Sequence, residues 1–402
     1  MSGHVDEAVL NERPTGVIDG LSSKAMIFGG IGAVVTAFGF FTARDTFFQS
    51  YLIGYMFWMY ITLGSLGLLM VQYLSGGAWG IVTRRVFEAA VKTLPVMAIL
   101  FLPIAFDAKH LYEWARPEAL LDKAIQTKAA YLNLNFFYAR AVGYFVIWSA
   151  LAFTITGWSA KQDIEPLQPA GESERKFRLL SGPGLVLFVL TITFMSVDWM
   201  MSLDPHWTST IYGVLFIGSA GLSTLAFTIV ILAKLKAVKP MSEVMTVDRF
   251  HDLGKLMYAF VLLWAYFSVS QLIIVWSANL PEEIPFYLRR FSGTWGWVSV
   301  AVLIGHFVIP FMFLLSRSIK RNPKLASSVA IFILIMRSVE LSWMIAPMVR
   351  HDAHAGGPNV FDFAAVLAVG LVWLFFFFRN LASRSVVPAH DPYLKDALNG
   401  GH

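Results

Sequence analysis

The sequence predicts an all-α integral membrane protein that crosses the bilayer ten times. Of its 402 residues, 57% are hydrophobic and only 14% are charged, whereas soluble domains carry about 25% charged residues. Apolar runs long enough to cross a hydrocarbon core of about 30 Å also recur along the chain. The expected spans are residues 24–42, 51–74, 89–106, 134–159, 180–201, 210–233, 255–278, 294–316, 326–349 and 361–379. Together they form one membrane domain (24–379) between polar tails at 1–23 and 380–402.

The distribution of positive charge predicts the orientation of these spans. Most of the 31 Lys and Arg residues fall in loops on the side of the N-terminus, and cytoplasmic loops are enriched in these residues. Both termini are therefore expected to be cytoplasmic. The basic loops indicate this orientation and contact with anionic membrane lipids, so no nucleic-acid partner is expected. Residues 1–23 lack a basic stretch ahead of a short apolar core, so no cleaved signal peptide is expected.

The absence of cysteine limits the redox chemistry of the chain. It excludes an iron–sulfur cluster held by thiolates, a covalently attached haem c and any disulfide. Of the nine histidines, only His306 lies well inside an expected span, so a haem with two histidine ligands is not expected either. No metal site is predicted in this chain, and redox metals are expected on partner proteins.

Two similar segments indicate an internal repeat. "TFMSVDWMMSLDP" and "IMRSVELSWMIAP" both contain Ser-Val followed by a carboxylate, with Trp, Met and then Pro downstream. Spans two to five (51–201) and six to nine (210–349) would then form two four-helix bundles in parallel orientation, flanked by helices one and ten. Chance similarity between membrane sequences of low diversity is the alternative.

Several ionisable residues lie deep within expected spans, where such groups are costly and usually paired or functional. Arg140 either extends to the interface or faces Asp198 in the same bundle. Arg337 and Glu340 share a helix face, which predicts either a structural ion pair or a proton-relay carboxylate held by an arginine. His306 is either structural or a relay group, since imidazole exchanges a proton near neutral pH.

A stretch at the expected outer face is a candidate quinol site. Oxidation of a quinol releases protons, so such a site needs proton acceptors beside an apolar slot. Asp198, Asp204, His206 and Trp207 could form its mouth. The alternative is an interfacial turn whose tryptophans belong to the aromatic belt. Another outer loop, "RHDAHAGG" (350–357), is either a polar loop or a weak metal cluster.

The start of the seventh span is a candidate for proton exchange at the inner face. In "VDRFHDLGKLMYAF", His251 and Asp252 could collect or release protons, and Tyr266 could continue a relay into the span. The alternative is a solvated helix start followed by hydroxyl groups bonded to nearby carbonyls.

The long outer loop at residues 107–133 is expected to form a surface helix. Pro117 suits a helix start, and apolar residues recur at helical spacing through Leu132. Lys123 and Lys128 are expected to face water. This helix would either cover the bundle or form a docking surface for an extrinsic partner.

Three long motifs resemble a known family. They are "SVDWMMSLDPHWTSTIYG", "RFHDLGKLMYAFVLLWAYFSVSQLIIVWSANLPEEIPFYLRR" and "SVELSWMIAPM". They look like the smaller multi-span membrane subunit of alternative complex III, a bacterial quinol:cytochrome c oxidoreductase. That subunit is similar to the polysulfide reductase membrane-anchor family, and the resemblance covers all ten spans.

The resemblance implies partners and cofactors. It implies a larger homologous membrane subunit that houses a quinol site, an iron–sulfur subunit, and multihaem and monohaem cytochrome c subunits in the bacterial inner membrane. Haem c and iron–sulfur clusters on these partners would take electrons from menaquinol or ubiquinol. The electrons would pass to a cytochrome c or directly to a terminal oxidase.

The expected function is therefore that of a membrane subunit in this electron-transfer complex. It would support assembly and translocate protons through its intramembrane carboxylates. One alternative is a subunit with its own quinol site at the outer face. Another is an autonomous ion-coupled transporter, which also places charges at mid-membrane, although the parallel repeat and apparently uninterrupted spans argue against it.

Overall fold

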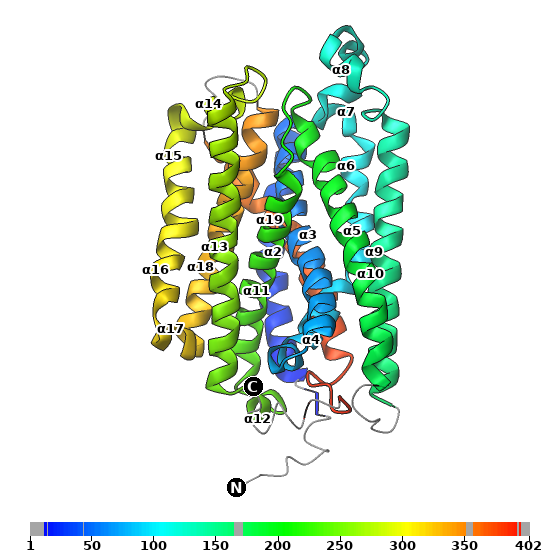
Figure 1. The fold of residues 1–402 in the computed structure, drawn as a ribbon, viewed down its shortest axis with the longest axis vertical. Helices are drawn as coiled ribbons and strands as arrows, with labels where there is room; N and C mark the ends of the chain where they lie inside the picture. Colours follow the sequence, from blue (N-terminus) through cyan, green and yellow to red (C-terminus); the bar gives the residue numbers. More distant parts are fainter. Residues whose placement is uncertain are drawn as a thin grey trace.

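The computed structural model describes residues 12–13, 15–42, 44–164, 172–350, 357–391 and 394. These residues form helices and turns without any strand, and they contain ten helices long and apolar enough to cross a membrane (Figure 1). This confirms the all-α, multi-span fold. The spans are α2 (Thr15–Thr42), α3 (Arg44–Ser75), α4 to α6 (Ala78–Val91, Leu94–Leu100, Leu102–Phe106), α9 (Leu134–Gln162), α10 (Glu172–Trp199), α11 (Tyr212–Leu235), α13 (Val247–Ala278), α15 with α16 (Gly293–Val302, Ile309–Leu315), α18 (Pro323–Val349) and α19 (Val360–Ala382).

The helices α3 and α11 occupy the centre of the molecule. Every residue of α3 from Ser50 to Met70 is buried, and α11 is also buried around most of its circumference. A helix buried on all sides must be apolar on all sides, which explains why both segments lack an amphipathic pattern. Small residues allow the two backbones to approach closely. A Cβ atom added at Gly64 of α3 would lie only 2.3 Å from the carbonyl oxygen of Ala220 on α11.

The remaining helices pack around this centre in two groups. On one side, α3 contacts α4 and α10, while α9 contacts α5 and α10. On the other side, α11 contacts α13 and α18, and α18 contacts α15. The terminal helices α2 and α19 pack against each other and against α3. Figure 1 places α7 (Ala108–Leu111), α8 (Lys123–Lys128) and α14 (Pro285–Phe291) at its upper end. It places α12 (Met241–Val244) and α17 (Arg317–Arg321) at its lower end.

Two spans are less regular than expected. The third span turns at Lys92–Thr93 and again at Phe101, and Pro95 and Pro103 lie in the first turns of the helical segments that follow. A proline lacks the N–H that would continue the preceding helix. The eighth span contains a π-helical turn at Leu303–Val308. The expectation of uninterrupted spans is therefore wrong.

The outer surface segment is also broken rather than continuous. A 3-10 helix covers Pro117–Leu121, and α8 follows it. Asp122 separates the two, because its side chain accepts a hydrogen bond from the N–H of Ala124 at 2.7 Å and caps α8. Lys123 is exposed, whereas Lys128 donates to the carbonyl oxygen of Pro205 at 2.6 Å. Lys128 therefore fastens this segment to the loop after α10.

Replacement of Gly64 by alanine tests the close packing of α3 on α11. Gly64→Ala is expected to lower the free energy of unfolding by about 1–3 kcal/mol, because the backbone of Ala220 would have to move. Gly143→Ala on α9 is the matched control, since no atom lies within 4 Å of its added Cβ. Thermal unfolding of both variants in the same detergent checks this expectation. Equal melting temperatures would contradict it.

Candidate functional site

Glu340 on α18 is a buried carboxylate held by residues from α13, α18 and the π turn. Arg337, one turn earlier on α18, forms an ion pair with it. The Nε2 atom of His306 lies 2.9 Å from Oε2 of Glu340, and the indole N–H of Trp264 donates to Oε1 at 2.7 Å. Glu340 is 1% exposed, and Arg337 and His306 are fully buried. The four residues are called the Glu340 cluster below.

The local backbone explains how His306 reaches this carboxylate. His306 lies in the π turn between α15 and α16. Pro310 lacks the N–H that would bond the carbonyl of His306 in a regular α-helix. Single π turns of this kind are rare and occur frequently at functional sites. The sequence drew attention to His306, but its helical spacing alone did not predict its contact with Glu340.

Arg337 connects the Glu340 cluster to the central helix. Its guanidinium lies over the ring of Tyr60 on α3, 4.3 Å from the ring centre. An arginine can stack on an aromatic face in this way while its charge is paired elsewhere. Its Nε and Nη2 atoms have no hydrogen-bond partner among the described residues. Arg337 is therefore held by one carboxylate and one aromatic ring.

Asp198 on α10 forms a second buried cluster in the first group of helices. Arg140 on α9 binds it through two hydrogen bonds, from Nε to Oδ2 and from Nη2 to Oδ1, both at 2.8 Å. The hydroxyl of Tyr144 donates to Oδ2 at 2.7 Å. Asp198 is 1% exposed. Of the two interpretations of Arg140, the structure supports the one in which it faces Asp198.

Aromatic rings enclose the Arg140 guanidinium. It lies 3.9 Å from the ring centre of Tyr131 and 4.2 Å from that of Phe136, and its Nη1 atom donates to the carbonyl of Tyr131 at 3.0 Å. Burial, assisted by the negative charge of Asp198, raises the pKa of Tyr131. Tyr131 lies in the loop before α9, and its phenol therefore stays neutral beside the ion pair.

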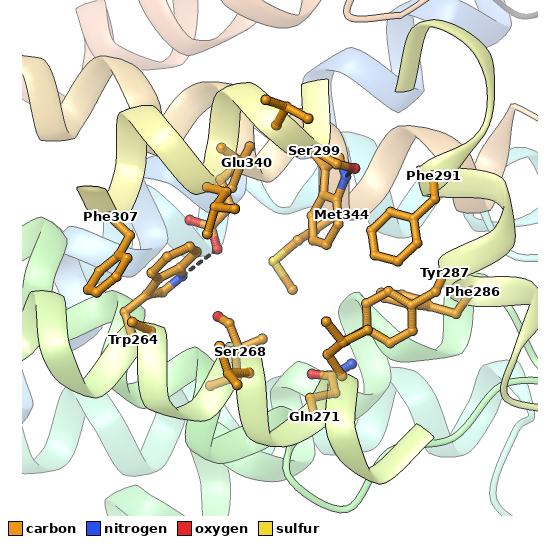
Figure 2. Close-up of a pocket in the computed structure, with 18 of the residues that line it drawn as sticks. Trp264, Ser268, Gln271, Phe286, Tyr287, Phe291, Ser299, Phe307, Glu340 and Met344 are labelled. Atoms are coloured by element: carbon orange, nitrogen blue, oxygen red, sulfur yellow. Dashed lines mark hydrogen bonds between the residues drawn. The ribbon is translucent and has the colours of Figure 1, made fainter. Parts of the chain in front are cut away.

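A cavity of about 520 Å³ borders the Glu340 cluster (Figure 2). Residues of α13, α14, α15 and α18 line it, and Glu340 and Trp264 form part of its wall. Figure 2 shows Phe291 and Tyr287 on the side across from Trp264. The remaining polar side chains of the wall are Ser268, Gln271 and Ser299. This volume falls within the range of small-molecule sites, which are mostly apolar with a few polar groups.

The residues expected at the quinol mouth have different partners, and none of them lines this cavity. Asp198 is bound by Arg140, whereas Asp204 accepts from Arg289 at 3.1 Å. His206 lies 3.2 Å from a carboxylate oxygen of Asp122. Trp207 is 2% exposed and stacks on Phe286, with ring centres 4.1 Å apart. In this structure, Asp204 and His206 hold loops in place through their ion pairs, and Trp207 packs against Phe286.

The expected relay along α13 is not assembled around Tyr266. The Tyr266 side chain is 65% exposed on the outer surface of the bundle, and Asp252 pairs with Lys255 at 3.2 Å. His251 is half-buried near the lower end. Consecutive helix residues are rotated by about 100°, so Tyr266 points away from the face that carries Trp264. Tyr266 does not contact the Glu340 cluster, and Trp264 is the α13 residue that contacts Glu340.

Further buried ion clusters were not predicted, and two of them are as follows. At the lower end, Arg85 pairs with Glu88 at 2.8 Å and also with Asp163. At the other end, Asp362 of α19 accepts hydrogen bonds from Arg350 and from the hydroxyls of Ser50 and Ser342, the last two at 2.6 Å. One feature of the sequence could have indicated them: a carboxylate lies near the start of an apolar run, Glu88 in "RRVFEAA" and Asp362 in "NVFDFAA". Other members of these clusters, Asp163 and Ser50, come from distant segments of the chain.

The described residues contain no group of three or more His, Cys, Asp or Glu side chains placed to hold a metal ion, and His351, Asp352 and His354 lie outside them. A scan against protein-family models found no match, and a search of the curated proteins found none either. These comparisons therefore assign neither a family nor a function to the chain.

A double-mutant cycle tests the Asp198 ion pair. Arg140→Leu is expected to lower the free energy of unfolding by about 3–5 kcal/mol, because it leaves a buried carboxylate without its cation. Adding Asp198→Leu should recover most of this loss, since an apolar pair leaves no unpaired charge. Thermal unfolding of both single variants and the double variant measures the coupling. Additive losses would contradict the pairing.

Proposed function

We propose that this protein is a membrane subunit of a respiratory quinol-oxidising complex of the alternative complex III type, and that its Glu340 cluster takes part in proton translocation. One observation carries the second part of the proposal. A fully buried histidine, His306, lies 2.9 Å from a buried carboxylate inside the membrane-spanning region. Ionisable groups placed there are costly and commonly mark proton or ion pathways.

The charges in the Glu340 cluster are suited to proton exchange. Arg337 balances the negative charge of Glu340, so with a neutral His306 the cluster carries no net charge. A proton that arrives at His306 adds one positive charge, 2.9 Å from the carboxylate of Glu340. Imidazole is the side chain that gains and loses a proton most readily near neutral pH. His306 is therefore the proposed proton carrier, and Glu340 is the carboxylate beside it.

The composition and surface of the chain support a role within a larger complex. Without cysteine, the proposed electron transfer depends on iron–sulfur and cytochrome c subunits and on a larger homologous membrane subunit. The segment around α8 projects above the spans in Figure 1 and offers a docking surface for such extrinsic subunits. The loops at the lower end carry basic residues such as Lys236 and Arg317, so we assign that end to the cytoplasm of a bacterial inner membrane.

Purification in a mild detergent tests the proposed complex. The chain, tagged and isolated from its native membrane, is expected to bring haem c absorbance and several further subunits with it. A transporter acting alone would instead give a colourless preparation of this chain. Such a preparation, active in ion transport after reconstitution, would contradict the proposed complex.

Replacement of Glu340 tests the proton pathway. Glu340→Gln keeps the approximate shape but removes the negative charge beside His306. Quinol oxidation coupled to proton movement in reconstituted vesicles is expected to slow by about 100-fold, the lower end for loss of an acid–base group. Glu282→Gln, at an exposed loop position, is the control, and haem content verifies assembly. An assembled Glu340→Gln complex with unchanged turnover and proton movement would leave Glu340 a structural ion-pair partner.

A further inference from the structure

The short helix α17 brings a lysine against the first turns of α13, at the lower end in Figure 1. Lys320 is only 9% exposed, and its aliphatic stem crosses α13 at Gly254. A Cβ atom added at Gly254 would lie 2.7 Å from Cγ of Lys320 and 2.9 Å from its Cβ, so glycine leaves the space that the stem occupies. The ammonium lies 5.4 Å from the ring centre of Tyr258, one turn further along α13. This packing fixes the direction of the side chain.

Two further cations lie close to Lys320. Arg317 is three residues earlier in α17, which places it on the same face of the helix, and it is exposed. Lys255 of α13 is exposed as well. The charges of all three act on the imidazole of His251, so the three groups lie around one point. Burial, assisted by the positive charge of Lys255, lowers the pKa of Lys320.

The carboxylates nearby leave two of these cations uncompensated. The two acidic residues of α13 are already paired, Asp252 with Lys255 at 3.2 Å and Asp248 with Arg321 at 2.7 Å. Among the described residues, neither Lys320 nor Arg317 forms an ion pair. An ammonium and a guanidinium are donors only, so the group that complements them is an anion with several acceptor oxygens.

The surface next to these cations is apolar and faces lipid. On α13, Leu262 and Tyr266 follow Lys255 at helical spacing, and both are exposed. On α16, Met312 and Leu315 are 60% and 51% exposed. Cations at the end of a span, continued by exposed apolar side chains along it, match a phospholipid. Its phosphate lies at the membrane surface and its acyl chains lie along the span, whereas a soluble anion would use only the charged part.

We propose that Lys320, Arg317 and Lys255 bind the phosphate of an anionic phospholipid, whose acyl chains lie against α13 and α16. Basic sites between membrane helices bind anionic headgroups in this way. The packed stem of Lys320 distinguishes the site from the general excess of positive charge in the loops, because it holds one ammonium in a defined place. Binding requires neither electron transfer nor proton movement in this chain. The inference therefore goes beyond the proposed function and does not depend on it.

Native mass spectrometry of the protein purified from its membrane tests this site. Phosphatidylglycerol and phosphatidylcholine of equal chain length are the probes, and phosphatidylglycerol is expected to bind more tightly. Lys320→Gln should weaken its binding by about fivefold, the contribution of one cation next to an anionic lipid. Lys161→Gln is the control, since it removes an exposed lysine at the same end of the molecule, on α9. It should leave binding unchanged.

A second variant separates a shaped site from a general attraction between charges. Gly254→Ala keeps every charge but places a methyl group where the Lys320 stem lies, so it should also weaken the binding of phosphatidylglycerol. Thermal unfolding in the same detergent verifies that the variants are folded. Unchanged binding in folded Lys320→Gln, or an equal loss in Lys161→Gln, would overturn the proposal. Equal binding of the two lipids to the parent protein would overturn it as well.

Inorganic phosphate distinguishes a lipid from a soluble anion at the same cations. Phosphate at the concentration of the lipid should not displace phosphatidylglycerol, because it makes no contact with the apolar surfaces of α13 and α16. Sodium chloride at equal ionic strength is the control, since salt weakens every charge interaction at a surface. Displacement by phosphate but not by chloride would assign the site to a soluble anion and contradict the proposed lipid.

Discussion

The cost of placing a carboxylate in hydrocarbon organises much of this structure. Glu340 is stable at its position only because a cation, an imidazole and an indole N–H surround it. These partners fix α13, the π turn and α18 relative to one another, and the stacking of Arg337 on Tyr60 fixes them relative to α3. A shift of any one helix would leave a buried charge or donor exposed to lipid. The arrangement of the second group of helices therefore depends on one side chain.

The same constraint is met differently in the first group. Asp198 receives two parallel hydrogen bonds from Arg140 and a third from Tyr144. A bidentate arginine is strong and directional, and the surrounding rings of Tyr131 and Phe136 exclude lipid from it. Both acceptor atoms of Asp198 are thus occupied by donors that do not change protonation near neutral pH. Glu340 differs because one of its neighbours is a histidine.

The sequence predicted what depends on local composition. Apolar length located all ten spans, and the three-residue spacing of Arg337 and Glu340 predicted their ion pair. It did not predict contacts that depend on packing between distant segments. The contact of Trp264 with Glu340 depends on how α13 is rotated about its axis. The contact of His306 with Glu340 depends on a π turn. The sequence likewise did not show that Tyr266 lies on another face of α13 than Trp264, since the rotation of the helix was unknown.

The sequence did not predict where helices are interrupted, although it contains the residues that interrupt them. Pro95 and Pro103 interrupt the third span, but prolines are tolerated in membrane helices when neighbouring groups satisfy the backbone, so their presence alone did not decide the outcome. Asp122 ended one surface helix and capped the next. An aspartate at this position favours a new helix start, whereas the apolar spacing favours one continuous helix. The sequence alone did not show which of the two would form.

The cavity gives the two buried carboxylates different surroundings. Glu340 forms part of the wall of a space that opens toward lipid, whereas the oxygens of Asp198 face Arg140 and Tyr144. A closed, fully bonded pair chiefly specifies helix packing. A carboxylate at the edge of a cavity can also interact with a molecule that enters it. Two clusters with similar composition can therefore serve different purposes, because access and the presence of a titratable neighbour differ between them.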